Sequence, residues 1–384
     1  MDAPTSGFAS PDDLQRWARV TADTLRRMPG PGPVEAPLGE EAQAALDQLR
    51  RDPPKRGERL ALLVGGGEGA ARLVAGLEAR GGGGIRLAGF FDDRDKDRAP
   101  PAAGCPRLGS IDEVIAFARA ADIGLVIVTL PLSAERRIMA LMRRLWVLPA
   151  DIRLSAYSQD FAFRDFGLED GPLIPVLRRP ISGLGHRVKR AIDVLGAAGA
   201  LLILAPALLA IALAVRLESR GPILFRQPRH GFNDQVFQVL KFRSMRAEDC
   251  DPEAKRIVVR DDPRVTRVGA ILRRTSLDEL PQLWNVLRGD MSLVGPRPHA
   301  LEARSSREEL FTRIVDGYSG RHRARPGITG LAQIEGWRGE VDGPEALRRR
   351  FEADLRYIEN WSLWLDLRIL ASTVPALLTT TRAY

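Results

Sequence analysis

Hydrophobic and polar residues follow two different patterns along the chain. Between residues 58 and 155, short apolar runs such as Arg59–Val64, Ile85–Phe91 and Ile123–Leu130 are separated by amphipathic stretches. Apolar runs of this length that alternate with helical patterns predict parallel strands covered by helices on both faces of a sheet. We therefore expect residues 58–155 to form a Rossmann-like α/β domain, with one of its helices at 134–145.

The segments on either side of this domain have a different composition. Residues 1–57 are rich in Pro, Gly, Ala and charged residues, and they predict a mobile arm with two short helical stretches. Residues 156–185 predict a linker that contains a strand at Leu173–Leu177, and residues 186–384 predict a second, mainly α-helical, membrane-associated domain. The first residues lack a basic flank followed by an apolar core, so no signal peptide is expected.

A long apolar run, Ala191–Val215, opens the second domain. Its 25 residues contain one charge, Asp193, which is the pattern of a transmembrane helix. Pro206 divides the run into arms of ~22 and ~15 Å, each too short for a hydrocarbon core of ~30 Å. Basic residues, Arg229 among them, flank both ends and favour the cytoplasmic side. We expect a re-entrant helix–break–helix hairpin at 191–217, broken at Pro206, and a kinked complete span is the alternative.

Composition narrows the possible partners only slightly. Lys and Arg outnumber Asp and Glu by 57 to 49, so the net charge is +8. This excess suits an anionic partner, which could be nucleic acid, a phospholipid surface or a phosphorylated substrate. Cys105 and Cys250 are the two cysteines of the sequence, and without CxxC or Cys/His spacing they predict neither a disulfide framework nor a cysteine zinc site.

Two adjacent carboxylates, Asp278 and Glu279, are the leading catalytic candidates. A capping box from Ser276 to Glu279 would explain them structurally. However, Pro281 would then fall in the second turn of the helix, where its ring clashes. If Pro281 begins the helix instead, both carboxylates lie just outside a positive helix end, which favours an ionised nucleophile. Both interpretations remain open from the sequence.

Basic residues near this pair are candidates for binding phosphate. Several occur in stiff contexts rich in Pro or Gly, such as 295–298 and 325–330. Pre-organised guanidinium groups bind phosphate oxygens in pairs, whereas a solvated basic face attracted to anionic lipid would explain scattered charges. The candidate phosphate-binding residues are Lys241, Arg243, Arg264, Arg273, Arg274, Arg297 and Arg325.

The first domain contains a glycine-rich turn that is typical of dinucleotide binding. Gly65, Gly67 and Ala70 match G-x-G-x-x-A, and Asp92 follows the second strand, where a ribose-binding acid would lie. The pattern is weak alone, so nucleotide binding and a purely assembling or regulatory role both remain open. Residues 58–155 contain neither Tyr nor His, which disfavours an NAD-dependent enzyme with its catalytic partner there.

The second half of the chain, from about residue 189 onwards, resembles the monotopic polyprenyl-phosphate phosphoglycosyl transferases, also called the bacterial sugar transferase family. The matching strings are KFRSM at 241–245, TSLDELPQLWNVLRGDMSLVGPRP at 275–298, PGITGLAQ at 326–333 and YIENWSLWLDLRIL at 357–370. Two further runs are most like the undecaprenyl-phosphate glucose phosphotransferases: PRPHA at 296–300 and GWRGE at 336–340. The first domain resembles the nucleotide-binding-like domain of longer family members.

This resemblance implies transfer of a hexose 1-phosphate, glucose 1-phosphate by likeness, from a UDP-sugar to undecaprenyl phosphate with release of UMP. Asp278 would attack the sugar-bearing phosphorus and form a covalent intermediate. Glu279 would orient the site, hold Mg²⁺ together with Asp278, or activate the acceptor. Lys241 and the arginines would stabilise the phosphate charge. The implied setting is exopolysaccharide or capsule synthesis on the cytoplasmic face of a bacterial inner membrane, in contact with membrane lipid, without nucleic acid and with a possible homodimer.

Two alternatives to glucose 1-phosphate transfer remain. The same chemistry with UDP-galactose or a UDP-N-acetylhexosamine would use the same residues, because nothing in the sequence identifies the hydroxyl pattern of the sugar. A non-catalytic membrane scaffold for polysaccharide assembly would need no nucleophile, so it predicts that Asp278 is dispensable.

Overall fold

The computed structural model divides the chain into two compact units, Met1–Arg179 and Pro180–Tyr384. Each unit is described by itself. The described residues are 16–21, 36–79, 84–94, 105–131, 134–155, 173–181, 183–249, 262–301, 310–315, 317–337 and 343–379.

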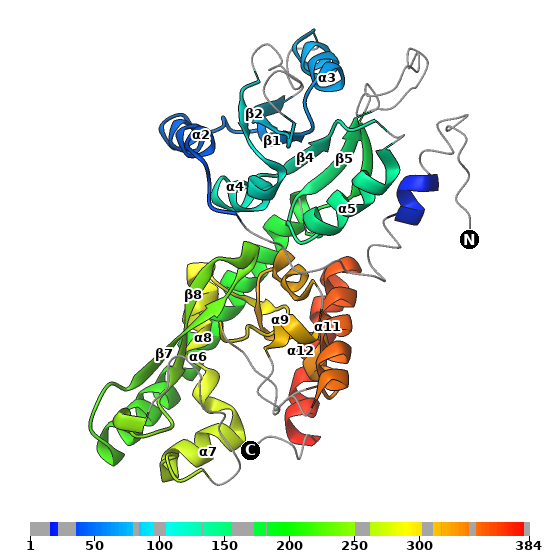
Figure 1. Cartoon of the computed structure of the whole chain (residues 1–384). Coiled ribbons are helices and arrows are strands. Elements are labelled where there is room, and N and C mark those ends of the chain that lie inside the picture. Colours follow the sequence, from blue (N-terminus) through cyan, green and yellow to red (C-terminus); the bar gives the residue numbers. More distant parts are fainter. Residues whose placement is uncertain are drawn as a thin grey trace. The chain divides into compact units, whose positions relative to one another are not determined.

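The first unit is built on a six-stranded sheet with the order β3-β2-β1-β4-β5-β6 (Figure 1). The first five strands are parallel, and β6 runs antiparallel to β5 at one edge. The strands are β1 (Arg59–Val64), β2 (Ile85–Phe91), β3 (Arg107–Gly109), β4 (Leu125–Val128), β5 (Asp151–Ser155) and β6 (Leu173–Leu177). The parallel α/β architecture is confirmed. Because β6 is paired with β5, part of the expected linker belongs to this sheet.

Four helices accompany the sheet, and its core is formed by buried strand residues such as Leu63, Phe90 and Ile127. The helices are α2 (Glu40–Arg51), α3 (Glu68–Ala79), α4 (Val114–Ala120) and α5 (Glu135–Leu145). Helix α2 buries Ala42 and Leu46. This part of the predicted mobile arm is therefore packed against the folded unit, because the apolar stripe of α2 is buried. Residues 16–21 are also helical, and the rest of residues 1–35 lies outside the described residues.

The second unit is mainly helical, with two small two-stranded sheets. Strands β7 and β8 form an antiparallel hairpin, and β9 pairs in parallel with β10. Its elements are α6 (Gly183–Glu218), β7 (Leu224–His230), β8 (Val236–Phe242), α7 (Arg267–Thr275), α8 (Gln282–Arg288), β9 (Ser292–Val294), α9 (Phe311–Ile314), β10 (Gly327–Thr329), α10 (Leu331–Ile334), α11 (Pro344–Glu359) and α12 (Leu363–Thr379).

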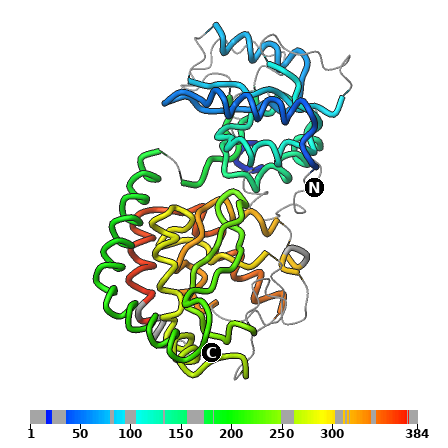
Figure 2. The backbone as a smooth tube through the Cα atoms, turned by 90° about the vertical axis from the view of Figure 1, so that its left-hand side faces the viewer, coloured from blue at the N-terminus to red at the C-terminus, as the bar shows by residue number. Residues whose placement is uncertain are grey.

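Helix α6 contains the long apolar run. The helix is long and apolar enough to cross a membrane, and only 6% of its most apolar 18-residue window is buried. Pro206 lies inside the helix, which continues from Gly183 to Glu218, so the expected break at Pro206 is not confirmed. Figure 2 shows instead that the axis of α6 changes direction along its length. Proline removes one backbone hydrogen bond and crowds the preceding turn, which bends a helix without ending it where the flanking residues favour helix.

Buried polar contacts attach the first half of α6 to the other elements of the second unit. Lys189 Nζ donates to Asp366 Oδ2 at 2.7 Å and to the carbonyl oxygen of Val294 at 3.0 Å. One helical turn later, Asp193 accepts hydrogen bonds from the Ser292 hydroxyl and the Leu293 amide, both at 2.9 Å. Strand β9, which leads directly to the 295–298 segment, is therefore held by α6 on one side.

Strand β10 holds β9 on its other side through a close crossing of the two chains. A Cβ atom on Gly295 would overlap the Arg325 carbonyl oxygen, and one on Gly327 would overlap the Gly295 amide nitrogen. These two glycines explain the motifs VGPRP and RPGITG, because only residues without a side chain allow the two backbones to approach so closely. The crossing places Arg297 next to the carboxylate pair.

Candidate active site

Asp278 and Glu279 lie in a single 3₁₀ turn, Leu277–Glu279, between α7 and α8. Ser276 ends α7 in a left-handed conformation with a φ of 57°, and its side chain makes no capping hydrogen bond to this turn. The capping-box interpretation is therefore wrong. The second interpretation made Pro281 the first helical residue. In the structure Pro281 is the N-cap of α8 and Gln282 begins the helix, so both carboxylates still precede its start.

Glu279 is neutralised by two cations. Lys241 Nζ donates to Glu279 Oε1 at 2.9 Å. The Arg297 guanidinium donates to both carboxylate oxygens, with Nη1 lying 3.0 Å from Oε2. Burial by itself would raise the pKa of Glu279, but Arg297 and Lys241 outweigh it and hold this pKa well below its usual value. Glu279 is therefore an ionised carboxylate whose two oxygens are already engaged.

Asp278 has a different environment, although it is the adjacent residue. It is buried, and its carboxylate makes no hydrogen bond or ion pair to any residue that the structure describes. Burial raises the pKa of Asp278, the negative charge of Glu279 adds to this, and Lys241 opposes it. The expectation that a helix end alone would favour the ionised form is thus incomplete, because burial has the larger effect. The Asp278 carboxylate is left for another reactant.

One face of the β7–β8 hairpin carries two basic side chains, Lys241 and Arg229, that lie near the carboxylate pair. Phe225 lies opposite Lys241 and Arg229 lies opposite Phe237, so Lys241 and Arg229 share a face. Arg229 donates to the Pro298 carbonyl oxygen. Burial lowers the pKa of Arg229 to about 10, with a further reduction from Arg297 and an opposing effect of Glu279. Sequence reasoning placed Arg229 at the membrane flank, since the hairpin register that brings it here needs the structure.

Arg243 and Arg325, both predicted to bind phosphate, instead satisfy the carbonyl groups of helix ends. The Arg243 guanidinium donates to the carbonyl oxygens of Ser219 and Arg220, at the end of α6. Arg325 Nε donates to the carbonyl oxygen of Gly289, which follows α8, at 3.1 Å. The last carbonyls of a helix lack partners within the helix and attract cations. These contacts support a structural role for both arginines, and their predicted role in phosphate binding stays a prediction.

The other predicted arginines differ in their distance from the carboxylates. Arg264 forms an ion pair with Asp262 at 2.6 Å, and Arg274 is exposed on α7. Arg273 is among the main influences on the pKa of Asp278, which it lowers, and its Nε donates to the Ser244 hydroxyl at 2.8 Å. The structure therefore brings together Lys241, Arg273, Arg297 and the unpredicted Arg229.

The predicted magnesium ligands fit that ion unequally. Mg²⁺ binds proteins through one or two carboxylates and completes its shell with waters and substrate phosphates. Asp278 fits this chemistry, because its carboxylate has no described hydrogen-bonding partner. Glu279 does not fit, because Lys241 and Arg297 already occupy both of its oxygens. An ion at this site would therefore be held by Asp278 and by the substrate.

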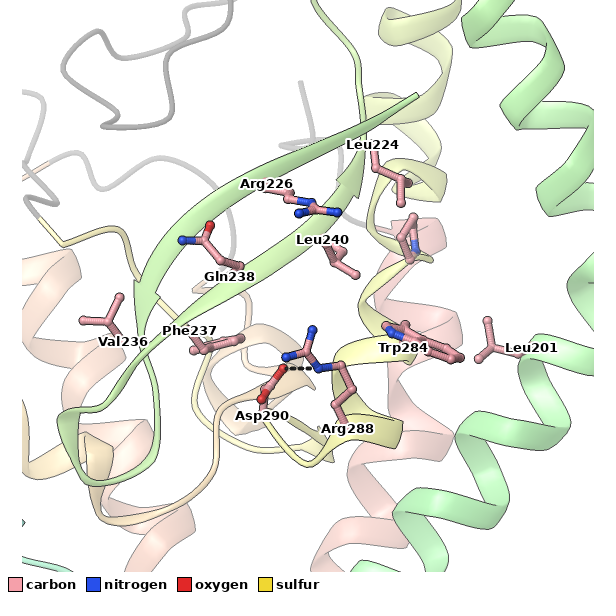
Figure 3. Close-up of a pocket in the computed structure, with 11 residues that line it drawn as sticks. Leu201, Leu224, Arg226, Val236, Phe237, Gln238, Leu240, Trp284, Arg288 and Asp290 are labelled. Carbon is pink, nitrogen blue, oxygen red and sulfur yellow. Dashed lines mark ion pairs between the residues drawn. The ribbon is translucent and has the colours of Figure 1, made fainter. Parts of the chain in front are cut away.

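A pocket of about 610 Å³ lies between the β7–β8 hairpin, α8 and α6. Figure 3 shows Arg226 and Gln238 on the hairpin, Trp284 beside Leu201 of α6, and an ion pair between Arg288 and Asp290. Pro281 also lines the pocket, only two residues after Glu279, whereas Leu224, Arg226, Gln238 and Leu240 line it from the hairpin face opposite that of Lys241 and Arg229. The pocket combines apolar walls with two arginines beside the long exposed helix.

The glycine-rich turn of the first unit is closed by its own side chains. Asp92 Oδ2 accepts the amide of Gly66 at 2.6 Å, and Arg94 pairs with the same carboxylate at 2.7 Å. Burial opposes ionisation, but the hydrogen bonds from Arg94 and Gly66 leave the pKa of Asp92 lowered. The predicted ribose-binding acid is therefore engaged within the turn.

Comparison with known proteins supports the resemblance found in the sequence. A family model described as bacterial sugar transferase matches residues 184–380, and one described as a CoA-binding domain matches residues 42–156. The chain is 41% identical over 324 residues to the undecaprenyl-phosphate glucose phosphotransferase of Komagataeibacter xylinus, covering 83% of this chain and 59% of the relative.

Two further relatives carry the name UDP-glucose:undecaprenyl-phosphate glucose-1-phosphate transferase. The Escherichia coli protein is 41% identical over 269 residues, which are 69% of this chain and 57% of the relative. The Caulobacter vibrioides protein is 52% identical over 226 residues, which are 58% of this chain and 83% of the relative. The chain thus spans less than two thirds of the first two relatives and most of the third. Because the family model matches just over half of the chain, the chain belongs to the bacterial sugar transferase family.

Proposed function

We propose that this protein transfers a hexose 1-phosphate, with glucose 1-phosphate as the first choice, from a UDP-sugar to undecaprenyl phosphate and releases UMP. The observation that supports this proposal most directly is that the carboxylates of Asp278 and Glu279 have different contacts. One carboxylate is tied by Lys241 and Arg297, and the adjacent one is buried without a described hydrogen bond. A nucleophile such as Asp278 needs a carboxylate oxygen that is not already hydrogen-bonded. A residue that holds the cations in place, such as Glu279, needs fixed contacts to them.

In the first half-reaction, an oxygen of Asp278 attacks the sugar-bearing phosphorus of the UDP-sugar. An aspartyl–phosphorus bond forms while the bond to the bridging oxygen breaks, and UMP leaves with that oxygen. The attacking carboxylate must be ionised, and Lys241, Arg273 and Arg297 favour this form. The same cations stabilise the charge that develops on the phosphoryl oxygens.

In the second half-reaction, a phosphate oxygen of undecaprenyl phosphate attacks the same phosphorus. The aspartyl–phosphorus bond breaks, the Asp278 carboxylate is restored, and the product is a polyprenyl diphosphate hexose. A covalent intermediate allows one cationic site to serve both substrates in turn. Mg²⁺ bound through Asp278 and the diphosphate would neutralise negative charge on the donor substrate.

The pocket beside α6 is the proposed site for the first isoprene units of the lipid acceptor. Its apolar wall includes Leu201 and Trp284, and Trp284 is 53% exposed. Arg226 and Arg288 in the same pocket can attract the lipid phosphate. Pro281, two residues after Glu279, also lines this pocket, so a lipid bound here would bring its phosphate close to the segment that carries the carboxylate pair.

The proposed membrane placement is re-entrant, with α6 dipping into the inner membrane and returning to the cytoplasmic face. The change of direction along α6 (Figure 2), the proline inside this helix, its exposed leucines and the basic residues at both ends support this placement. Single cysteines placed at either end of α6 should react with an impermeant thiol reagent only from the cytoplasmic side. A complete span would instead make one end reactive from the opposite side.

The central experiment uses the full chain in detergent with Mg²⁺, undecaprenyl phosphate and UDP-glucose, and identifies the released nucleotide. Wild type should release UMP, and Asp278→Asn should release none, because the amide cannot act as the nucleophile. Glu345→Gln is the matched control, since Glu345 lies on the exposed surface of α11 and its ion pair among the described residues is with neighbouring Arg349. The control should release UMP at the wild-type rate.

The other outcomes of this experiment discriminate among the alternatives. Release of UDP would mean ordinary glycosyl transfer and would refute the proposed mechanism. If UDP-glucose is inert, UDP-galactose and the UDP-N-acetylhexosamines identify the sugar, whereas no turnover with any donor supports a scaffold. Omitting the acceptor should leave a hexose phosphate attached to wild type, detected by intact mass, and none on Asp278→Asn.

A further inference from the structure

Two histidines and an aspartate meet where the tip of the β7–β8 hairpin packs on a distant segment. His230 ends β7, Asp234 lies in the 3₁₀ turn Phe232–Asp234 at the hairpin tip, and His322 lies in the 3₁₀ segment Tyr318–Arg323. The mechanism proposed above uses none of these three side chains. They come together only in the fold, because about 90 residues separate His322 from the other two.

The three side chains point their nitrogen and oxygen atoms at one another. Asp234 Oδ1 lies 2.8 Å from His230 Nδ1 and 2.7 Å from His322 Nδ1. All three candidate ligand atoms lie within 4.8 Å of one another. The imidazole rings are stacked, with centroids 5.3 Å apart and planes inclined by 14°. The side chains of His322 and Asp234 are 11% and 15% exposed and that of His230 is 33% exposed, so the cluster is partly buried and remains accessible through His230.

The backbone of the hairpin tip adopts an uncommon conformation to present Asp234. Asn233 and Asp234 have φ values of 55° and 61°, in the left-handed region that L-residues other than Asn, Asp and Gly seldom adopt. Such conformations persist where the surroundings require them, and they often coincide with functional sites. At this tip the conformation brings the Asp234 carboxylate against both imidazole rings.

We propose that His230, Asp234 and His322 form a binding site for a Zn²⁺-class transition metal. Two imidazole nitrogens and one carboxylate oxygen form a mixed donor set that Zn²⁺ binds well, with a fourth position for water. Mg²⁺ prefers oxygen ligands, so this site should discriminate against the ion expected at Asp278. Zn²⁺ at ~2.0–2.1 Å from each ligand sets the ligand atoms ~3.3 Å apart. Asp234 Oδ1 therefore needs to move only about 0.5 Å away from each imidazole nitrogen, and the two histidine ligand atoms, which lie within 4.8 Å of each other, need to reach the same ~3.3 Å separation.

The bound metal would clip together two segments that support the candidate active site. Arg229, next to His230, contacts the Pro298 carbonyl, and Arg321, next to His322, donates to the Arg297 carbonyl oxygen at 2.7 Å. The end of β7 and the 3₁₀ segment Tyr318–Arg323 therefore each contact the backbone of residues 297–298. The site is thus structural, and its existence does not depend on the proposed sugar-phosphate transfer.

The test measures Zn²⁺ binding by the full chain in detergent after chelator treatment and in excess Mg²⁺. Wild type should bind one Zn²⁺ per chain, and its thermal midpoint should rise with added Zn²⁺. Asp234→Asn should weaken Zn²⁺ binding by at least about 100-fold, because loss of a ligand exceeds the 10- to 100-fold effect of losing an outer-shell partner. Asn suits this position because it tolerates the left-handed backbone.

A second ligand variant and a control variant show whether Zn²⁺ binds at the proposed site. His322→Gln should also abolish the Zn²⁺-dependent rise, whereas His186→Gln, outside the cluster, should bind Zn²⁺ as wild type does. Folding of each variant is checked by circular dichroism and size-exclusion chromatography. Wild type that binds no Zn²⁺ refutes the site and leaves Asp234 as a carboxylate that faces two histidines. Equal binding by wild type, Asp234→Asn and His322→Gln refutes it as well, since the metal would then bind elsewhere.

Discussion

Replacement of Asp366 by Ala would show how firmly buried polar contacts hold α6 against the second unit. Asp366, on α12, accepts hydrogen bonds from Lys189 Nζ at 2.7 Å, from the Tyr357 hydroxyl at 2.8 Å and from Trp361 Nε1 at 3.2 Å. The side chains of Asp366 and Lys189 are both 9% exposed. Alanine removes all three interactions at once and leaves the Lys189 charge buried beside a carbonyl oxygen.

The loss in free energy of unfolding can be worked out from these contacts. An uncompensated buried charge costs about 3–5 kcal/mol, and an unsatisfied Trp361 donor adds about 1 kcal/mol. Tyr357 loses less, because its hydroxyl also contacts the Val294 carbonyl oxygen at 2.9 Å. Asp366→Ala should therefore lower the free energy of unfolding of this unit by about 4–6 kcal/mol. For a unit of this size that corresponds to a fall of about 8–24 °C in the thermal midpoint.

The assay is thermal unfolding of the full chain in detergent, followed separately by tryptophan fluorescence and by circular dichroism. Glu345→Ala is the surface control, and it should change the midpoint by less than about 2 °C, because exposed ion pairs contribute little. The double variant Lys189→Met/Asp366→Asn should be less destabilised than Asp366→Ala, since it buries no charge and keeps an acceptor for Trp361. A midpoint for Asp366→Ala within about 2 °C of wild type would refute the reasoning and mean that water reaches this network.

Four further measurements test the site. The acid limb of the pH profile of kcat/KM should lie above pH ~3.9, because the nucleophile must be ionised and burial raises the pKa of Asp278. An acid limb at or below that pH contradicts the assignment of Asp278 as the nucleophile. Arg297→Lys removes the paired contact with Glu279 and should lower kcat by about 10²–10³-fold in the UMP assay. Arg243→Met should lower the thermal midpoint while leaving the KM for UDP-sugar unchanged, and a raised KM would restore Arg243 as a substrate ligand. Trp284→Ala should raise the KM for undecaprenyl phosphate and not that for UDP-sugar, whereas equal effects would place the lipid elsewhere.

Local patterns in the sequence predicted most elements of the first unit. The apolar runs at 59–64, 85–91 and 173–177 form strands with the expected bounds. Strands β3 and β5 were not predicted, because β3 has only three residues and β5 includes Asp151 and Arg153. The antiparallel pairing of β6 was not predicted either, since strand direction depends on contacts outside the strand itself.

The candidate site was predictable only in part. Asp278, Glu279, Lys241 and Arg297 were found from local motifs, and the structure places the last three in contact. Which arginine meets which partner was not predictable, because guanidinium groups bind carboxylates, phosphates and helix-end carbonyls with similar chemistry. Arg325 lies in the same kind of Pro- and Gly-rich context as Arg297, yet it donates to the carbonyl oxygen of Gly289 after α8.

The contact between Lys189 and Asp366 also sets an order of events during synthesis. The two residues are 177 positions apart. At about 5–20 residues per second, Asp366 leaves the ribosome ~9–35 s after Lys189. Throughout that interval α6 can already meet the membrane, while Lys189 has no carboxylate partner from α12. The second unit therefore cannot complete its buried polar contacts until α12 has been made, and the long apolar surface of α6 is synthesised well before that point.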